Sequence, residues 1–234
     1  MCAAHVVLLS SHETRLRCRA GVFGVAAVWM PPTRRRSAPR CGPVSCWSVM
    51  AKLSHTGLMS TLVAITGPIA SGKNTVAELL AKRCESKGLT VVIADVDDVA
   101  AMVTGPGAAA SGLWFAAHLA HGAMVAQWML SKVNVVISVG PIYTLAEQEA
   151  LFGPLPAETR PCRVLIDAPL SVTWERVRAD VTRGRSRQYD FHVAAHERFR
   201  SLMTDIPADL VFNSGDTSPD GIADAIWQAV DIAD

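Results

Sequence analysis

The sequence predicts a three-layer α/β fold in which helices cover both faces of a central, mostly parallel sheet of about five strands. Three observations support this prediction. From residue 60 onward, short apolar runs alternate with longer segments of helical character. The runs are continuously apolar, as strands buried on both faces are. A glycine-rich turn separates the first run from the first helical segment.

Five segments are expected to form the strands. The first, 62–66, directly precedes the glycine-rich turn, and the second, 90–94, follows the first helical segment. The third, 133–139, is rich in β-branched residues, which favour extended chain. The fourth, 163–166, and a short fifth, 210–212, complete the sheet. Because helical segments separate the strands, the strands are expected to run parallel.

Helical segments stand between and after these strands. The first is expected to end at Gly88, and no internal repeat interrupts the pattern. Residues 59–234 are therefore predicted to form one domain, with a small arginine-rich lid at about 183–190. The expected helices are 73–87, 112–131, 144–152, 171–182, 190–203 and 219–230.

Charge and hydropathy narrow the range of functions. Residues 1–58 hold seven arginines and Lys52 against Glu13 as their one acid, so the remainder of the chain is mildly acidic. A nucleic-acid-binding domain normally presents a basic face, so a small substrate is the better expectation. The longest apolar stretch, 113–130, is about one membrane span long. Its histidines, glutamine and glycine favour a buried helix over a membrane span.

The first 58 residues differ from the rest in composition. They contain four of the six cysteines, and the whole chain lacks a CxxC pair, which argues against disulfides or zinc and predicts a cytoplasmic location. Arginines precede the apolar run 20–30, as in signal and transit peptides. Because Met50 and Met59 lie just before the first strand, an over-extended gene start or a disordered leader is the simpler interpretation. A targeting segment and a folded N-terminal element are the alternatives.

The glycine-rich turn has the glycine and lysine spacing of a phosphate-binding loop, in the strand–loop–helix context that such a loop needs. Gly67 and Gly72 permit backbone conformations that let successive N–H groups converge on phosphate oxygens. The helix adds its positive end, and the Lys73 ammonium reaches the β- and γ-phosphates. The residues predicted to bind ATP here are Gly67, Ala70, Ser71, Gly72, Lys73, Asn74 and Thr75.

Asn74 departs from the usual loop, in which a serine or threonine after the lysine supplies a hydroxyl to magnesium. This end of the loop resembles that of adenylate kinases, which carry Gly-Lys-Gly-Thr here. The resemblance implies that Asn74 is tolerated, that the Mg²⁺ accompanying ATP is held largely through water and that Thr75 contacts phosphate. Thr75 and Asp95 are the residues predicted to lie nearest the metal.

Acidic residues follow the second strand and not the third, which lacks the terminal acid that switch GTPases place beside magnesium. Asp95 and Asp97 stand at the carboxyl edge of the sheet, where ligands of such folds bind. If the strand continues that far, alternation places them on the same side. We expect Asp95 to hold a magnesium-bound water and Asp97 to accept the proton of the hydroxyl that is phosphorylated. The alternative is that Asp97 or Asp98 caps the next helix.

The phosphate loop, the Asp-x-Asp after the second strand, the missing acid on the third and an arginine-rich segment together resemble the shikimate and gluconate kinase group of P-loop small-molecule kinases. The order of the last elements is more similar to chloramphenicol phosphotransferase, in which an Asp corresponding to Asp97 is the proposed base. The resemblance extends from about Thr61 to the C-terminus. It implies a P-loop NTPase fold and does not identify a substrate.

The arginine-rich segment is predicted to form the lid. In the kinases that the chain resembles, a mobile lid here brings arginines onto the transferring phosphoryl group and stacks one on adenine. Arg183 and Arg187 are therefore assigned to catalysis, Arg185 to the substrate and Arg178 to the nucleotide. For Arg176 and Arg178 the alternative is an ordinary solvated helix charge.

Three further residues, His118, His121 and Tyr143, are predicted to contact the acceptor. The helix that carries His118 and His121 follows Asp97 and should border the acceptor pocket, with buried, hydrogen-bonded histidines as the alternative. Tyr143 follows the third strand at the ligand edge of the sheet.

These assignments predict ATP-dependent phosphorylation of a hydroxyl or phosphate on a small metabolite or antibiotic, by a monomer or homodimer that uses ATP and Mg²⁺. Neither nucleic acid nor a membrane is expected as a partner. A nucleotide-binding regulator with slow or no transfer is one alternative, and a nucleoside or nucleotide kinase is another. The lid arginines and Asp97 favour transfer, because a protein that only senses ATP has little use for both.

Overall fold

A computed structural model describes residues 60–106 and 112–230. The predicted leader, 1–58, lies outside the described residues, as do residues 59, 107–111 and 231–234. Among the described helices, none is both long enough and apolar enough to cross a lipid bilayer.

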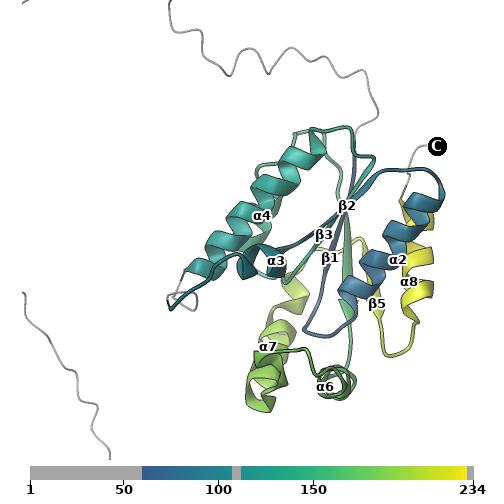
Figure 1. Ribbon diagram of the computed structural model, residues 1–234. Coiled ribbons are helices and arrows are strands. Elements are labelled where there is room, and N and C mark those ends of the chain that lie inside the picture. The colour runs from purple at the N-terminus through teal and green to yellow at the C-terminus, as the bar shows by residue number, and fades with distance from the viewer. Residues whose placement is uncertain (1–59, 107–111, 231–234) are drawn as a thin grey trace, which may run out of the picture. The chain divides into compact units, whose positions relative to one another are not determined.

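One five-stranded sheet forms the centre of the domain (Figure 1). Its strands are β1 (Thr61–Thr66), β2 (Val91–Asp95), β3 (Val135–Val139), β4 (Cys162–Asp167) and β5 (Leu210–Asn213). They lie in the order β2-β3-β1-β4-β5, and every adjacent pair is parallel. β1 and β3 are buried along almost their whole length, as continuous apolar runs predict. The predicted five-stranded parallel sheet is therefore confirmed.

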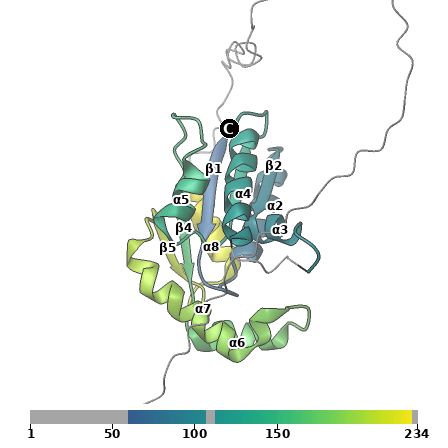
Figure 2. The ribbon, with the colours of Figure 1, turned by 90° about the vertical axis from the view of Figure 1, so that its left-hand side faces the viewer.

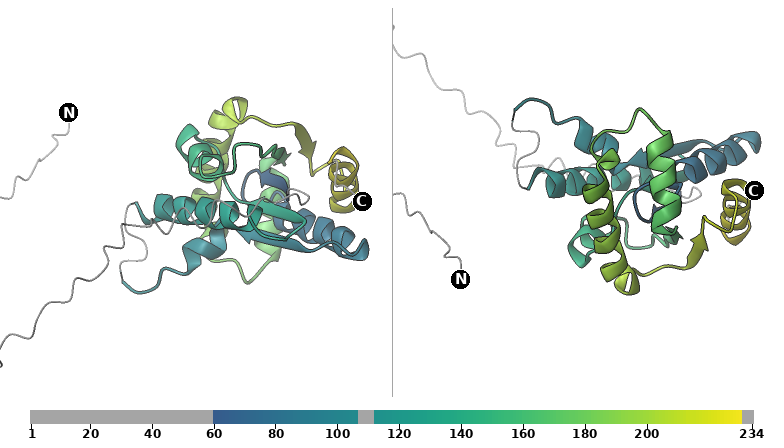
Figure 3. Two further views of the ribbon diagram at one scale, coloured as in Figure 1. Left: turned by 90° about the horizontal axis from the view of Figure 1, so that it is seen from above. Right: turned by 90° about the horizontal axis from the view of Figure 1, so that it is seen from below.

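Two helices, α2 (Lys73–Ser86) and α8 (Pro219–Ala229), lie side by side over one face of the sheet (Figures 1 and 3). Val76 and Leu80 of α2 and Ile226 of α8 are fully buried against β1, β3 and β4. Burying an apolar side chain of this size contributes about 1.5–3 kcal/mol. This cluster fixes the helix that follows the phosphate loop on the sheet.

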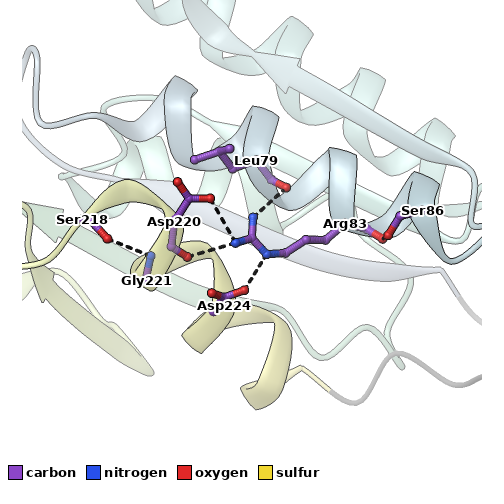
Figure 4. Close-up of polar contacts among 7 residues, drawn as sticks. All are labelled: Leu79, Arg83, Ser86, Ser218, Asp220, Gly221 and Asp224. Carbon is purple, nitrogen blue, oxygen red and sulfur yellow. Dashed lines mark hydrogen bonds and ion pairs between the residues drawn. The ribbon is translucent and has the colours of Figure 1, made fainter.

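Arg83 joins α2 to α8 at the solvent edge of this layer (Figure 4). Its Nε donates to Asp224 Oδ1 at 2.7 Å, and its Nη2 donates to the backbone oxygen and Oδ1 of Asp220 at 3.2 and 3.3 Å. Nη1 donates to the carbonyl oxygen of Leu79 at 3.1 Å. Both aspartates are exposed, so each ion pair contributes about 0–1 kcal/mol. The network therefore fixes the orientation of α2 relative to α8 more than it adds to the free energy of unfolding.

The opposite face is covered by α4 (Leu113–Met129) and α5 (Leu145–Phe152). Val125 and Met129 of α4 pack on Leu62 and Val136 of the sheet. The two helices touch at Gly122, where a Cβ would lie 1.8 Å from a carbonyl oxygen of α5, so any larger residue would force them apart. Helix, sheet and helix thus form the three predicted layers.

The remaining helices surround the carboxyl ends of the strands. Figures 1 and 2 show α6 and α7 beyond the end of the sheet at which β1 leads into the phosphate loop. Two short 3₁₀ turns flank α7, the first of them within the predicted lid. These elements are α3 (Val96–Ala101), α6 (Leu170–Ala179), η1 (Arg185–Arg187), α7 (Tyr189–Leu202) and η2 (Met203–Asp205).

Helix α3 corrects one prediction. β2 ends at Asp95 and α3 begins at the next residue, so Asp97 lies in a helix and strand alternation does not relate the two acids. The physical reason is local. The Asp95 carboxylate accepts the backbone N–H of Asp97 at 2.8 Å, which starts the helix as an N-cap.

Candidate active site

The phosphate loop joins β1 to α2 and takes backbone conformations that only small residues tolerate. Gly67 has φ 151°, and a Cβ there would lie 2.0 Å from the Ile166 carbonyl oxygen of β4. Gly72, directly before α2, is left-handed with φ 97°, and Ala70 is left-handed with φ 60°. The first N–H groups of a helix have no intrahelical partner. The start of α2 is therefore available to an anion such as phosphate.

Lys73, the first residue of α2, folds back over the loop. Its Nζ donates to the carbonyl oxygens of Gly67 at 2.9 Å and Pro68 at 2.8 Å. Burial lowers the pKa of Lys73 from 10.5 to about 8, although the charges of Asp97 and Asp95 oppose this shift. The ammonium therefore lies at the loop on two neutral acceptors, which phosphate oxygens can replace with stronger, charge-assisted hydrogen bonds.

Tyr143 supports the same loop from beyond the end of β3. Its hydroxyl donates to the Gly67 carbonyl oxygen at 2.7 Å, and its ring packs edge-on against Phe199 with centroids 5.4 Å apart. The residue is 8% exposed, and burial raises its pKa. Tyr143 borders the cleft, as predicted, but its hydroxyl is already hydrogen-bonded to the phosphate loop.

The two acids after β2 have different environments. Asp95 is 6% exposed, and its oxygens accept Asp97 N at 2.8 Å and Asn74 Nδ2 at 2.6 Å. Asp95, and neither Asp97 nor Asp98, is the residue that caps α3. Asp97 lies in the cleft, where desolvation and the charge of Asp95 raise its pKa while Lys73 lowers it. A carboxylate with a raised pKa is a better proton acceptor.

Arg176 is the main site residue that the sequence left undecided. From α6 it donates to Ala70 O at 3.1 Å, Ser214 Oγ at 2.9 Å and Ser214 O at 2.8 Å. Ser214 follows β5 and donates its own hydroxyl to Ser71 O at 2.7 Å. Three segments distant in sequence thus meet at the phosphate loop. Arg178, which was predicted to bind the nucleotide, is exposed and lies outside the cleft lining.

The lid arginines make few contacts. Arg183 pairs with Asp180 Oδ2 at 3.1 Å and is 37% exposed, and the Arg185 guanidinium lies 4.5 Å from the ring centroid of Phe191. Both arginines line the cleft, as their predicted roles require. Arg187 is exposed and lies outside the lining, so the structure does not bring it to the site predicted for it.

His118 is buried, with 2% exposure, and lies outside the residues that line the cleft. Its ring meets Trp114 edge-on with centroids 5.3 Å apart, and its Nε2 has no hydrogen-bond partner within the described parts of the chain. Burial lowers its pKa. Trp114 therefore occupies the position at the cleft that was predicted for His118. His121 Nε2 lies 3.0 Å from Ala94 O. This histidine is therefore buried and hydrogen-bonded, which was the alternative to a contact with the acceptor.

A cleft of about 820 Å³ lies over the phosphate loop, a volume typical of small-ligand sites. Sequence reasoning missed Glu147 and Arg198, which line it from α5 and α7 and form an ion pair at 3.6 Å. No motif marks either residue. The lining consists of Ile69, Ala70, Gly72, Lys73, Asn74, Thr75, Asp97, Trp114, Pro141, Tyr143, Glu147, Arg183, Arg185, Ser186, Phe191, Ala194, Ala195 and Arg198.

The donor set at the loop fits a magnesium ion that arrives with a nucleotide. The Thr75 hydroxyl and the Asn74 amide are both exposed in the cleft, and magnesium prefers such oxygen ligands. Within residues 60–106 and 112–230, no three His, Cys, Asp or Glu side chains are grouped closely enough to hold a metal by themselves. Phosphate oxygens and water would have to complete the coordination.

The sheet order and the phosphate loop define the fold class: the chain has the P-loop α/β fold, which it shares with solved structures of shikimate and APS kinases. No family model matches the chain, and no curated protein matches it in sequence.

Solved structures show which proteins share this fold. The chain is similar to shikimate kinase from Bacteroides thetaiotaomicron, at 16% identity and TM-score 0.54 over 72% of this chain and 97% of that one. It is also similar to APS kinase from Mycobacterium tuberculosis in complex with AMPPNP and APS, at 17% identity and TM-score 0.52 over 74% of this chain and 98% of that one. A third similar structure is shikimate kinase from Acinetobacter baumannii in complex with shikimate, at 18% identity and TM-score 0.50 over 74% of this chain and 93% of that one. At these identities the likeness establishes the fold alone, and this fold is the one expected from the resemblance to P-loop small-molecule kinases.

Proposed function

We propose that this chain is an ATP-dependent phosphotransferase that acts on a hydroxyl or phosphate group of a small molecule. The observation that carries the proposal is that Lys73, Asp97 and Arg183 line one cleft. They supply a cation for the nucleotide phosphates, a proton acceptor for the incoming hydroxyl and a guanidinium for the transferring group. The AMPPNP bound by the similar APS kinase supports ATP as the nucleotide.

The geometry suggests a direct transfer. The acceptor oxygen bonds to the γ-phosphorus while its proton passes to Asp97, and the bond from the γ-phosphorus to the bridging oxygen breaks to release ADP. Lys73 exchanges the carbonyls of the loop for phosphate oxygens, and Arg183 and Arg185 spread the charge that develops on the phosphoryl group. Magnesium, held near Asn74 and Thr75, would neutralise phosphate charge.

The partner is proposed to be a small acceptor, because the volume of the cleft matches small-ligand sites. A monomer or homodimer and a cytoplasmic location remain proposals. The cysteines of the described residues, Cys84 and Cys162, are free thiols, which is compatible with a reducing compartment.

A nucleoside or nucleotide kinase is a second candidate. Trp114 and Phe191 both line the cleft, and aromatic rings suit a planar base as the acceptor. A nucleotide-binding regulator remains the alternative from another class, and it would leave Asp97 without a role.

Acceptor-dependent ADP release tests the proposal. The full chain is incubated with ATP, Mg²⁺ and pooled sugars, nucleosides and hydroxyl-bearing antibiotics, and products are searched by mass for one added phosphoryl group. In Asp97→Asn, transfer should fall by about 10²–10⁴-fold with ATP affinity retained. Asp98→Asn is the matched control, because its exposed carboxylate lies outside the cleft lining. Tight ATP binding with no acceptor effect across the library would favour the regulator.

A further inference from the structure

Asn74 occupies the loop position where a hydroxyl residue normally meets magnesium, and the structure shows what its amide does there. Asn74 Nδ2 donates to Asp95 Oδ2 at 2.6 Å. An ionised carboxylate only accepts hydrogen bonds, so the amide must turn its nitrogen, and not its oxygen, toward Asp95. Because the nitrogen and the oxygen branch in different directions from one carbon, Asn74 Oδ1 does not point at Asp95 when Nδ2 does.

Asp95 is well suited to hold this orientation. Its carboxylate is buried, and its other oxygen is fixed by the backbone N–H of Asp97 at the start of α3. The acceptor therefore stays in place whether or not the cleft is filled. Removing the Asn74 amide would leave the buried Asp95 Oδ2 without this donor, which favours keeping the pair together.

The other end of the amide is available to a ligand in the cleft. Asn74 is exposed and lines the cleft beside Lys73 and Thr75, and no group in residues 60–106 or 112–230 donates to its Oδ1. Amide oxygens are neutral, hard ligands of the kind that magnesium and calcium accept in proteins. A neutral ligand suits a position close to the Lys73 ammonium and the Asp97 carboxylate.

We propose that Asn74 presents its amide oxygen to the divalent cation that accompanies the nucleotide, and that Asp95 acts as a positioning residue by anchoring the amide nitrogen. The inference rests on the proposed function insofar as ATP is the nucleotide. It replaces the predicted role of Asp95 as holder of a magnesium-bound water with an indirect one.

The test compares ATP affinity in Mg²⁺ with ATP affinity in EDTA, measured by titration calorimetry on the full chain. The ratio of the two dissociation constants isolates the cation from all other contacts with the nucleotide. In Asn74→Ala this ratio should fall by about tenfold, while the affinity in EDTA changes little. In Asn74→Ser, which restores a hydroxyl oxygen, most of the ratio should be kept.

Asp95→Asn tests the positioning role. Asparagine can still cap α3, but it no longer obliges Asn74 to present its nitrogen, so the ratio should fall severalfold with little change in melting temperature. Asn134→Ala is the matched control. That asparagine accepts the N–H and hydroxyl of Thr90 at 2.9 and 2.7 Å, before β2 and at the opposite end of the sheet from the loop. Its removal should leave the ratio unchanged.

Two results have separate meanings. If Asn74→Ala and Asp95→Asn keep the ratio of the unmodified protein, the inference is overturned and the proposed function stands. If the unmodified protein binds ATP neither with Mg²⁺ nor in EDTA, the proposed function fails first. Manganese, read by its electron paramagnetic resonance spectrum in the ATP complex, gives a second readout. Asn74→Ala should change that spectrum, and an identical spectrum contradicts a contact with Asn74.

Discussion

The phosphate loop and the predicted lid segment both place cations at one cleft, but the protein holds these cations in opposite ways. Lys73 and Arg176 make five hydrogen bonds to backbone and hydroxyl oxygens, and the loop itself is fixed by Tyr143. Arg183 has one exposed ion pair, with Asp180. The other lid arginines contact at most one aromatic ring in the described structure.

This difference suggests a division of labour. A site that is already ordered binds its ligand without the entropy cost of ordering it, so under the proposed function the loop would hold ATP. A segment with few buried contacts opens at low free energy, so under the proposed function the predicted lid would admit substrate and then close over the phosphoryl group. The following predictions test this contrast, from the largest expected effect to the smallest.

Lys73→Met removes the cation of the ordered half. We expect transfer to fall by about 10²–10³-fold, since the lost ammonium is aimed at charge that develops during the reaction. Lys82→Met, on the exposed side of the same helix, is the control for a lost lysine charge. ADP release measures both. An active Lys73→Met enzyme would mean that the lid, and not the loop, carries the charge.

Arg176→Ala tests whether the loop is ordered by its surroundings. The substitution deletes three hydrogen bonds from a charged donor and leaves the carbonyl oxygens of Ala70 and Ser214 without this partner. The free energy of unfolding should therefore fall by about 1.5–3 kcal/mol. ATP affinity should fall with it. Arg178→Ala, two residues away and exposed, should change neither property. Denaturant melts and calorimetry provide the measurements, and equal effects of the two changes would refute the contrast.

Proton uptake tests the environment of Lys73. Burial holds its pKa at about 8 before ATP binds, and neighbouring phosphate oxygens would raise it. Binding should therefore take up protons above neutral pH, and ATP affinity should decline as pH rises through about 8. Calorimetry in two buffers of different ionisation enthalpy measures the uptake. Lys73→Met should abolish it, and an unchanged uptake in that variant would assign the proton to another group.

Arg185→Ala should give the smallest effect. A cation–π contact at an exposed site contributes about 0.5–1 kcal/mol, so losing the contact with Phe191 should speed hydrogen exchange slightly at the start of α7. Arg187→Ala, whose side chain has no partner among the described residues, is the control. Strong destabilisation by Arg185→Ala would show that the lid is as firmly held as the loop.

The fold could be read from the sequence because its signals are local. Continuous apolar strands, separating helices and the spacing of Gly67, Gly72 and Lys73 each depend on neighbouring residues and backbone physics. Helix α3 was missed because its start depends on a single side chain, Asp95, which accepts a backbone N–H two residues later. Its six residues give too short a pattern to detect.

The candidate site shows the same difference between local signals in the sequence and contacts made only in the folded chain. Asp97, Arg183 and Arg185 line the cleft, and the sequence could point to them because strand edges and arginine clusters are visible in it. Arg176 and Arg178 were indistinguishable there, because both are arginines near the end of one helix. Only packing decides that Arg176 reaches the loop while Arg178 faces water.

By itself, the sequence determined the parallel sheet, the phosphate loop and the presence of an acid and arginines at the ligand edge, because these follow from residue type and spacing. The tertiary structure decided which groups touch. It forms hydrogen bonds between Asn74 and Asp95, Tyr143 and Gly67, and Arg176 and Ser214. It also buries His118 outside the lining of the cleft. These pairs lie 21 to 76 residues apart, so only the folded chain can bring their polar groups within hydrogen-bond distance.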